Sequence, residues 1–325
     1  MKILVTGCAG FIGFHVCLKL LQSKKIQLYG IDNLNNFYDV EIKKKRLKLI
    51  LKQKKNFIFY KLDIKNQKKI LNNFKKNKYT HVLHFAANAG VRFSITNSKN
   101  YIDDNILGFY NILEAGKKYK ISHLVYASSS SVYGETLNFP SKEDFSSDKP
   151  ISLYAATKKT NEILSYSYSS IYKLPVTGLR FFTVYGPFGR PDMAIFKFCD
   201  KIFNSKKIEL YNKGDHYRDF TYIDDVVAFV CKILYKSPKS KIPNEIYNIG
   251  SGISIKLTRF LKEIDLLMKR KYTYKKLPFQ KGDVIKTHSD ISKIVKKTGY
   301  SPKYKIEEGL SKYVQWFLNY YGQKK

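Results

Sequence analysis

Tyr154 and Lys158 lie four residues apart and could act together on a proton. On a helix this spacing puts the phenol and the ammonium on one face, one turn apart. A free tyrosine has a pKa of about 10, and a neighbouring positive charge lowers it. A serine hydroxyl bonded to the substrate oxygen would complete a set that removes a proton from an alcohol, and serines fill residues 128–131. Tyr-x-x-x-Lys alone is common, so the prediction of a dehydrogenase-like site depends on the serine run and on the glycine-rich start of the chain.

A glycine-rich segment follows residues 2–6, which are short, apolar and β-branched and therefore predict a buried strand. The glycines are Gly7, Gly10 and Gly13. Glycines here permit a tight turn, a close approach of a pyrophosphate and close packing of the next helix on the sheet. The N–H groups at the start of that helix, at Phe11 and Ile12, would face the phosphates. The spacing G-x-x-G-x-x-G differs from G-x-G-x-x-G, so by itself it is only suggestive.

Asp32 ends the next predicted strand, residues 27–31. An acid roughly 20 residues after the glycines hydrogen-bonds the adenosine ribose of a dinucleotide and repels a 2′-phosphate. The segment therefore predicts NAD rather than NADP as the cofactor. A plain strand–turn–helix with packing glycines is the alternative, and it does not explain an acid at this position.

Strand and helix signals alternate along the first 180 residues. The predicted strands are 2–6, 27–31, 57–60, 81–85, 122–127 and 174–180, and the predicted helices are 11–21, 40–55, 67–76, 99–119 and 152–172. This alternation predicts an α/β fold with a doubly wound parallel sheet, whose ligands bind at the carboxyl ends of the strands. We expect a Rossmann domain over residues 1–180 and a smaller substrate-binding lobe over residues 181–325, some of whose segments return to the main sheet.

Four helices are expected in the second part of the chain. They are near 193–204, 225–236, 257–268 and 305–320. Asp224 and Asp225 resemble a paired-carboxylate site, but we expect them to cap a helix that begins at Val226.

The net charge is high. Lysine and arginine number 59 against 26 aspartate and glutamate residues, which gives +33. The basic residues are spread through every predicted helix, and the largest clusters, 43–46 and 269–271, are short and far apart. Specific nucleic-acid binding requires a concentrated basic patch, so we expect no specific nucleic-acid partner. An anionic substrate is compatible with this charge.

The sequence also gives expectations about the compartment. No apolar run approaches the ~20 residues needed to span a bilayer, and the chain starts with a strand rather than a signal peptide. Cys8, Cys17, Cys199 and Cys231 are isolated and lack the spacing of a zinc site or a disulfide framework. We expect a cytoplasmic protein that has no membrane segment and no metal site.

Taken together, these motifs resemble the extended short-chain dehydrogenases/reductases, in the NAD-dependent epimerase/dehydratase family that acts on nucleotide sugars. The resemblance extends over essentially the whole chain. It implies that Tyr154 is the catalytic base, that Lys158 also holds the nicotinamide ribose and that Ser129 is the catalytic hydroxyl. The further cofactor-binding residues that it implies are Asn33, Asp63, Ile64, Ala86, Ala87 and Asn105.

A narrower resemblance is to the UDP-glucuronate 4-epimerases. It is carried by residues 32–35, 180–187, 189–193 and 218–225. It implies a UDP-sugar substrate, transient oxidation at C4 with return of the hydride to the other face, and a product that is UDP-galacturonate. It also implies a homodimer formed through the helices 99–119 and 152–172.

The resemblance also indicates how the substrate is held. Arg190 is the best candidate for a bidentate contact to the sugar carboxylate. Thr183 stands where galactose-type epimerases have asparagine, and Ser130 follows the catalytic serine. Arg218 resembles the residue that contacts the substrate diphosphate, and Arg92 is a weaker candidate for an anion contact.

Several alternatives stay open. One is a 4-epimerase of UDP-glucose or of a UDP-N-acetylhexosamine. A UDP-sugar dehydratase or decarboxylase is disfavoured because Ser130 and Ser131 occupy positions where those relatives have acids. A non-catalytic, NAD-sensing Rossmann protein is disfavoured because it would have no use for Tyr154, Lys158 and Ser129 together.

Overall fold

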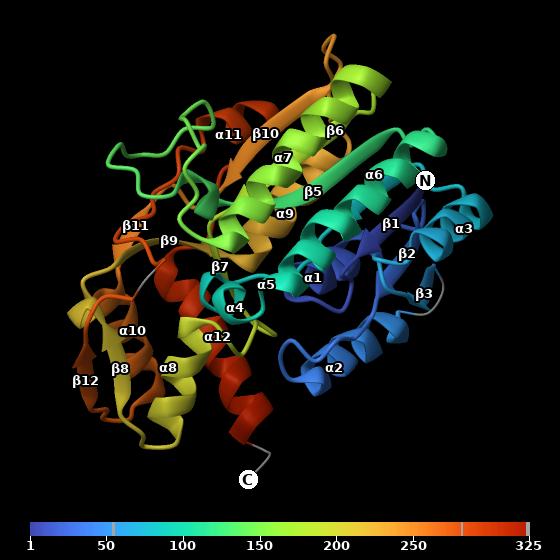
Figure 1. Ribbon diagram of the computed structural model, residues 1–325. Helices are drawn as coiled ribbons and strands as arrows, with labels where there is room; N and C mark the ends of the chain where they lie inside the picture. Colours follow the sequence, from blue (N-terminus) through green and yellow to red (C-terminus); the bar gives the residue numbers. More distant parts are fainter. Residues whose placement is uncertain (54–55, 281, 323–325) are drawn as a thin grey trace.

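The computed structural model describes residues 1–53, 56–280 and 282–322. A seven-stranded sheet with the order β10-β6-β5-β4-β1-β2-β3 forms its centre (Figure 1). The strands are β1 (Lys2–Thr6), β2 (Gln27–Asp32), β3 (Phe57–Lys61), β4 (His81–His84), β5 (His123–Ser129), β6 (Val176–Phe181) and β10 (Asn244–Ile249). All neighbouring pairs are parallel. The six strands predicted before residue 180 are confirmed, and the seventh comes from the C-terminal part of the chain.

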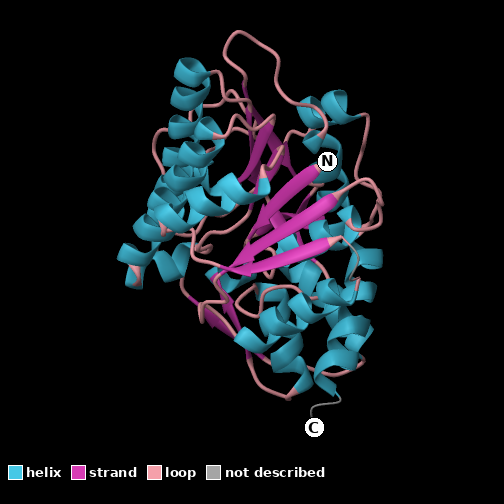
Figure 2. Cartoon of the chain, turned by 90° about the vertical axis from the view of Figure 1, so that its right-hand side faces the viewer, coloured by secondary structure: helices cyan, strands magenta, loops and turns pink. Residues whose placement is uncertain are grey.

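Helices cover both faces of this sheet, as Figure 2 shows. On one face lie α1 (Phe11–Leu20), α2 (Val40–Lys52), α9 (Ile223–Leu234) and α11 (Ser292–Thr298); on the other lie α3 (Gln67–Asn77), α6 (Gly108–Lys118) and α7 (Leu153–Tyr172). Side chains of a strand alternate between the faces, so Ile3 and Val5 join the core under α1 and α9, whereas Leu4 joins the core under α3 and α6. Both faces are therefore buried, which explains the continuous apolar strands and confirms the doubly wound α/β fold.

The remaining elements form a smaller lobe at the carboxyl edge of the sheet. It contains a three-stranded sheet of β11 (Ser254–Lys256), β9 (Tyr217–Tyr222) and β7 (Thr183–Tyr185), and a two-stranded sheet of β12 (Tyr274–Leu277) and β8 (Ile208–Tyr211). Its helices are α8 (Ala194–Phe203), α10 (Leu257–Met268) and α12 (Ile306–Tyr321). Phe220 of β9 stacks on Phe260 of α10 with ring centroids 3.9 Å apart, and this contact joins the three-stranded sheet to helix α10.

The segment between β4 and β5 differs from the single predicted helix. It contains α4 (Val91–Thr96), α5 (Ser98–Tyr101), a π-helical turn, η1 (Ile102–Leu107), and then α6. A π-helical turn inserts one residue into a helix and is frequent at functional sites. Here it carries Asn105 into the protein interior.

The expected capping role of Asp224 and Asp225 is wrong. Helix α9 begins at Ile223, and its N-cap, Tyr222, makes no side-chain cap bond. Asp225 is buried and accepts hydrogen bonds from the Tyr300 hydroxyl at 2.6 Å and from the Lys303 N–H at 2.9 Å. Its carboxylate therefore fixes the segment that leads into α12, and these partners are too distant in sequence to be foreseen.

Among helices in the described part of the chain, none combines the length and the apolar character needed to cross a membrane.

Candidate active site

The glycine loop between β1 and α1 is packed tightly against the segment that follows β4. Gly7 has a φ of +69°, and a Cβ there would lie 2.7 Å from the backbone nitrogen of Ala86. A Cβ on Gly13 would collide with the carbonyl oxygen of Gly7. Both positions therefore require glycine, and the loop opens directly into the N-terminus of α1. This arrangement fits a dinucleotide, whose pyrophosphate needs close backbone approach and free N–H groups.

A groove runs from the glycine loop to the end of β2. Among the predicted cofactor residues, its lining includes Gly7, Gly10, Asp32, Asn33, Ile64, Ala86 and Ala87. Phe11, Ile12 and Gly13 begin α1 and are not among the lining residues of the groove. Asp63 is held at its edge, because it accepts a hydrogen bond from the Asn33 amide at 3.2 Å.

Asp32 is the acid of this groove. Its carboxylate accepts hydrogen bonds from the Ala9 N–H at 3.0 Å and from the Leu34 N–H at 2.8 Å. Burial raises its pKa, although the bond from Leu34 and the charge of Lys43 oppose this effect. Hydrogen bonds thus fix the carboxylate at the end of β2, where the ribose of a dinucleotide would lie.

Asn105 does not line the groove, and its polar atoms are bonded within the protein. Its amide donates to the Asn88 carbonyl at 2.9 Å and to the Thr157 hydroxyl at 3.0 Å, and its carbonyl accepts from the Asn88 N–H at 2.8 Å. Asn105 therefore joins the segment after β4 to helix α7. We propose that it positions the catalytic helix rather than touching the cofactor.

Tyr154 and Lys158 occupy the first turns of α7, and Ser129 ends the adjacent strand β5. Helix α7 starts here because the Ser152 hydroxyl accepts a hydrogen bond from the Ala155 N–H at 3.2 Å. Lys158 is buried, and its ammonium donates to the Ala127 carbonyl of β5 at 2.9 Å. The predicted catalytic set is thus brought together at the carboxyl edge of the sheet.

The pKa values of Tyr154 and Lys158 differ from the expectation that the nearby ammonium lowers the pKa of the phenol. Burial raises the pKa of Tyr154, and a hydrogen bond with Ser129 and the positive charge of Arg190 only partly oppose this effect. Burial lowers the pKa of Lys158 to about 8. Without the cofactor, Tyr154 is therefore a neutral phenol near neutral pH. The positive charge that partly offsets the effect of burial on its pKa comes from Arg190 rather than from Lys158.

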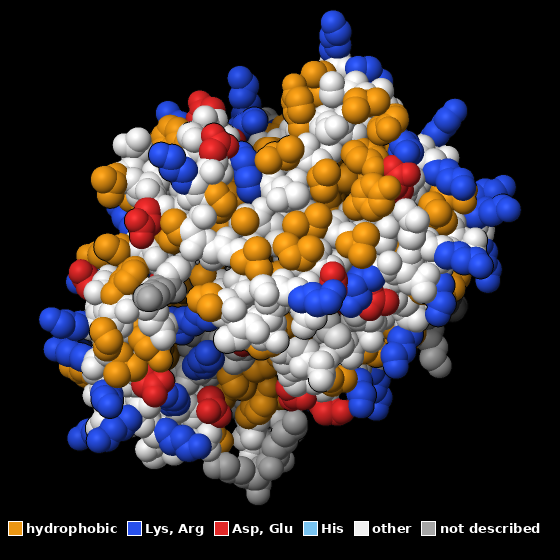
Figure 3. Space-filling model, viewed as in Figure 1, with side chains coloured by type: hydrophobic (Ala, Val, Ile, Leu, Met, Phe, Trp, Pro, Cys, Tyr) orange, Lys and Arg blue, Asp and Glu red, His pale blue; other side chains and the backbone are white. Residues whose placement is uncertain are grey.

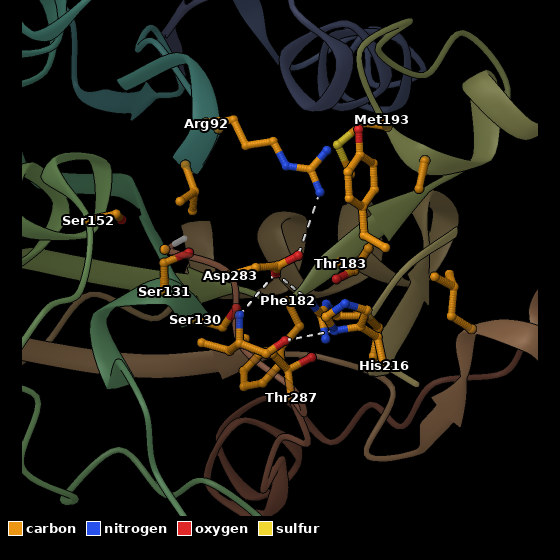
Figure 4. Close-up of a pocket in the computed structure, with 18 of the residues that line it drawn as sticks. Arg92, Ser130, Ser131, Ser152, Phe182, Thr183, Met193, His216, Asp283 and Thr287 are labelled. Carbon is orange, nitrogen blue, oxygen red and sulfur yellow. Dashed lines mark hydrogen bonds and ion pairs between the residues drawn. The ribbon is translucent and has the colours of Figure 1, made fainter. Parts of the chain in front are cut away.

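Besides the cofactor groove, the structure has a cavity of about 560 Å³ between the sheet and the smaller lobe. Figure 4 shows part of its lining. This volume is in the usual range for small-molecule sites. The predicted substrate residues on its lining are Arg92, Ser130, Thr183, Arg190 and Arg218. They come from α4, the turn after β5, β7, the loop before α8 and β9, so both parts of the chain form the cavity.

Arg190 enters this cavity already paired with Asp192. Its Nε donates to Asp192 at 2.9 Å, and its Nη2 donates to Asp192 at 2.5 Å and to the Ala89 carbonyl at 3.0 Å. Within the described ranges, no hydrogen bond reaches Nη1. A contact from Arg190 to a sugar carboxylate would therefore come from Nη1 alone, because Nε and Nη2 already donate to Asp192 and Ala89. The expected bidentate contact needs two parallel N–H donors, and this arrangement does not offer them.

Two further arginines from different parts of the fold meet one carboxylate. Arg218 of β9 lies 2.6 Å from Asp283. Arg92 of α4 lies 3.6 Å from the same side chain, as a dashed line in Figure 4 shows. Burial lowers the pKa of Arg218, and the charge of Asp283 opposes this effect. The pair is suited to an anionic group such as a diphosphate.

Sequence analysis missed several residues of these two cavities. Asp192 and Asp283 each hold a predicted arginine, and Lys43, which had been counted in a basic cluster, is buried beside Asp32 in the cofactor groove. His216 lines the substrate cavity, and its Nε2 has no hydrogen-bond partner in the part of the chain that the structure describes. An acid two residues after Arg190 was the one available signal, since that spacing allows pairing in a loop.

Comparisons with known proteins agree with this geometry. The model of the NAD dependent epimerase/dehydratase family matches residues 3–250. A UDP-glucuronate 4-epimerase of Thermodesulfobacterium geofontis is 43% identical over 314 residues, which cover 96% of this chain and 95% of that protein. The structure of UDP-glucuronic acid 4-epimerase from Bacillus cereus with UDP-glucuronic acid and NAD has a TM-score of 0.92 at 32% identity and covers 99% of this chain and 100% of that chain. The UDP-glucose 4-epimerase of Thermotoga maritima with UDP-glucose has a TM-score of 0.86 at 30% identity, with coverages of 99% and 100%.

Proposed function

The chain belongs to the NAD-dependent epimerase/dehydratase family, and we infer that it is an NAD-dependent UDP-glucuronate 4-epimerase. The observation that carries the acidic substrate is Arg190, a largely buried guanidinium that lines the substrate cavity and whose Nη1 has no hydrogen-bond partner among the described residues. Its charge acts on Tyr154, and it lies over the ring of Phe37, a residue shared by the cofactor groove and the substrate cavity. A sugar carboxylate bound there would hold the sugar beside the catalytic set.

The chain's own groups supply the proton transfers. The positive charge of the nicotinamide of bound NAD would favour the phenolate form of Tyr154. This phenolate takes the proton of the C4 hydroxyl, and Ser129 donates a hydrogen bond to the C4 oxygen. NAD bound in the cofactor groove would supply the hydride acceptor for C4 and would return the hydride to the other face once the 4-keto ring has turned over. Tyr154 then returns the proton to the C4 oxygen, so protein and cofactor end each cycle unchanged.

The nearby side chains favour epimerisation over elimination or loss of CO2. A dehydratase needs an additional acid and base beside the sugar. Ser130 and Ser131 line the cavity where such relatives have acids, and the carboxylate of Asp192 is engaged by Arg190. The same pairing with Asp192 restrains Arg190. A sugar carboxylate held by this restrained arginine would keep its C–C bond out of alignment with the C4 ketone, and this alignment is what loss of CO2 requires.

Incubation with UDP-glucuronate and NAD should yield UDP-galacturonate without accumulation of NADH, because the hydride returns in every cycle. Chromatography of the UDP-sugars and absorbance at the NADH band measure the two results together. UDP-glucose and UDP-N-acetylglucosamine serve as alternative substrates. Accumulation of NADH in proportion to product, or a pentose product in place of a uronic acid, would contradict the assignment.

We also propose that residues 1–180 bind NAD and that residues 181–325 form the substrate lobe, apart from α9, β10 and α11, which return to the main sheet. We further propose that the enzyme acts in the cytoplasm as a homodimer. The surface that supports the dimer is formed by exposed apolar side chains of η1, α6 and α7. Figure 3 shows such side chains gathered over α6 and α7. They include Ile102, Leu107, Tyr110, Ile163 and Tyr166. Phe109 and Leu113 of α6 are buried within the subunit, so a partner would contact only the exposed apolar side chains of these helices.

Sedimentation at micromolar concentration should give the mass of a dimer, and Ile163→Asp should shift it toward the monomer. A charge introduced at an apolar interface must lose its water, which costs several kcal/mol. Leu266→Asp is the matched control, because Leu266 on α10 is as exposed as Ile163, at 60%. A parent protein that sediments only as a monomer would reject the dimer.

A further inference from the structure

Arg46 of α2 is a fully buried arginine. The sequence places it in the basic run 43–46, which suggests a solvated surface. Arginine is almost never fully buried unless it is paired. Its partners therefore indicate what it does.

All five N–H groups of Arg46 are bonded, and every acceptor is a neutral oxygen. Nε and Nη2 both donate to the Phe188 carbonyl, at 3.1 and 2.6 Å, and Nη2 also donates to the Gly189 carbonyl at 3.2 Å. Nη1 donates to the Ala9 carbonyl at 3.0 Å and to the Tyr38 hydroxyl at 2.7 Å. A guanidinium has five donors in a fixed planar arrangement, so this contact set uses its full capacity.

The carbonyl acceptors belong to two loops that serve different ligands. Ala9 lies in the glycine loop of the cofactor groove, and Phe188 and Gly189 directly precede Arg190. Phe188 has a φ of +56°, which is costly for a bulky residue and persists only where surrounding contacts impose it. Two of the five bonds of Arg46 end on the carbonyl of this residue. Arg46 thus fastens the backbone next to Arg190 to the cofactor loop.

We propose that Arg46 is a positioning residue that joins the cofactor loop to the loop of Arg190, so that recognition of the sugar carboxylate depends on it. This inference rests on the proposed function, because it takes Arg190 as the carboxylate contact. Its consequence is selectivity: a shifted Arg190 loop weakens binding of an acidic sugar nucleotide more than binding of a neutral one.

The test uses Arg46→Lys in NAD-loaded protein that also carries Tyr154→Phe, so that turnover is slowed during the measurement. Lysine keeps the positive charge but has three donors on one atom, so it cannot hold both loops. Calorimetric dissociation constants for UDP-glucuronate and UDP-glucose give the selectivity. Affinity for UDP-glucuronate should fall by roughly tenfold, the lower range for losing one charge-assisted hydrogen bond, while affinity for UDP-glucose changes much less.

A variant destabilised elsewhere separates positioning from a general structural role. Phe74→Leu opens a gap in the core under α3, away from both loops, and should lower the melting temperature without changing the selectivity. Tyr38→Phe removes a single acceptor of Arg46 and provides a milder test should Arg46→Lys fail to fold; it should reduce the same selectivity by a smaller factor.

Unchanged selectivity in a folded Arg46→Lys protein, or in Tyr38→Phe where the lysine variant does not fold, would overturn the inference and leave the proposed function intact. A parent protein that binds both sugars equally would instead refute the acidic substrate, and the inference would fail with it.

Discussion

Tyr154→Phe should lower the rate of UDP-glucuronate epimerisation by at least ~10²-fold, the usual contribution of a positioned acid–base group. The phenyl ring keeps the edge-to-face contact with Tyr101, whose ring centroid lies 6.1 Å away, so the fold and the NAD content should be retained. Only the hydroxyl that accepts and returns the C4 proton is removed. Turnover, bound NAD and melting temperature should be measured on the same preparation.

Tyr166→Phe is the matched control, because it is the same change on the exposed side of the same helix. It should leave the rate unchanged. Near-normal turnover in Tyr154→Phe would remove this residue from the mechanism. A large loss in both variants would point to a defect of α7 rather than to proton transfer.

The main sheet could be predicted because its strands are buried on both faces. Such strands are short apolar runs, as in residues 2–6, and each is followed by a helix, so the alternation alone indicates the doubly wound fold. The π-helical turn η1 could not be predicted, since its sequence keeps helical periodicity. Asp225 was misread because its partners, Tyr300 and Lys303, lie far along the chain.

In the candidate site, sequence motifs identified the arginines but not the acids that hold them. Motif resemblance singled out Arg190 and Arg218, whereas Asp192 and Asp283 become relevant only once side chains are placed. The sequence pattern is also misleading at Arg46, because a basic run normally indicates a solvated face and this side chain is fully buried. Its burial depends on carbonyl groups of residues 188 and 189, which no local pattern reveals.

The Asp192 pairing changes how a substitution of Arg190 must be interpreted. Removing the arginine deletes its Nη1 contact to the substrate and also leaves the Asp192 carboxylate unpaired beside the sugar. An uncompensated carboxylate would repel the carboxylate of UDP-glucuronate as well as cost stability. Arg190→Ala alone would therefore overstate the contribution of the contact. Combining it with Asp192→Asn removes the repulsion.

Arg190→Ala with Asp192→Asn should lower the affinity for UDP-glucuronate by about 10- to 150-fold, because a charge-assisted hydrogen bond contributes roughly 1.5–3 kcal/mol. Asp192→Asn alone, which keeps the arginine, is the control and should lose much less. Binding of UDP-glucose should change little in either protein, since that sugar has no anion at C6. Calorimetry gives the affinities. Chromatography should reveal a 4-keto-pentose if the C–C bond of the loosened carboxylate aligns with the C4 ketone, so that the carboxylate leaves as CO2. Equal losses on both sugars, with no such product, would assign Arg190 to the structure of its loop and leave the acidic substrate without a recognising group.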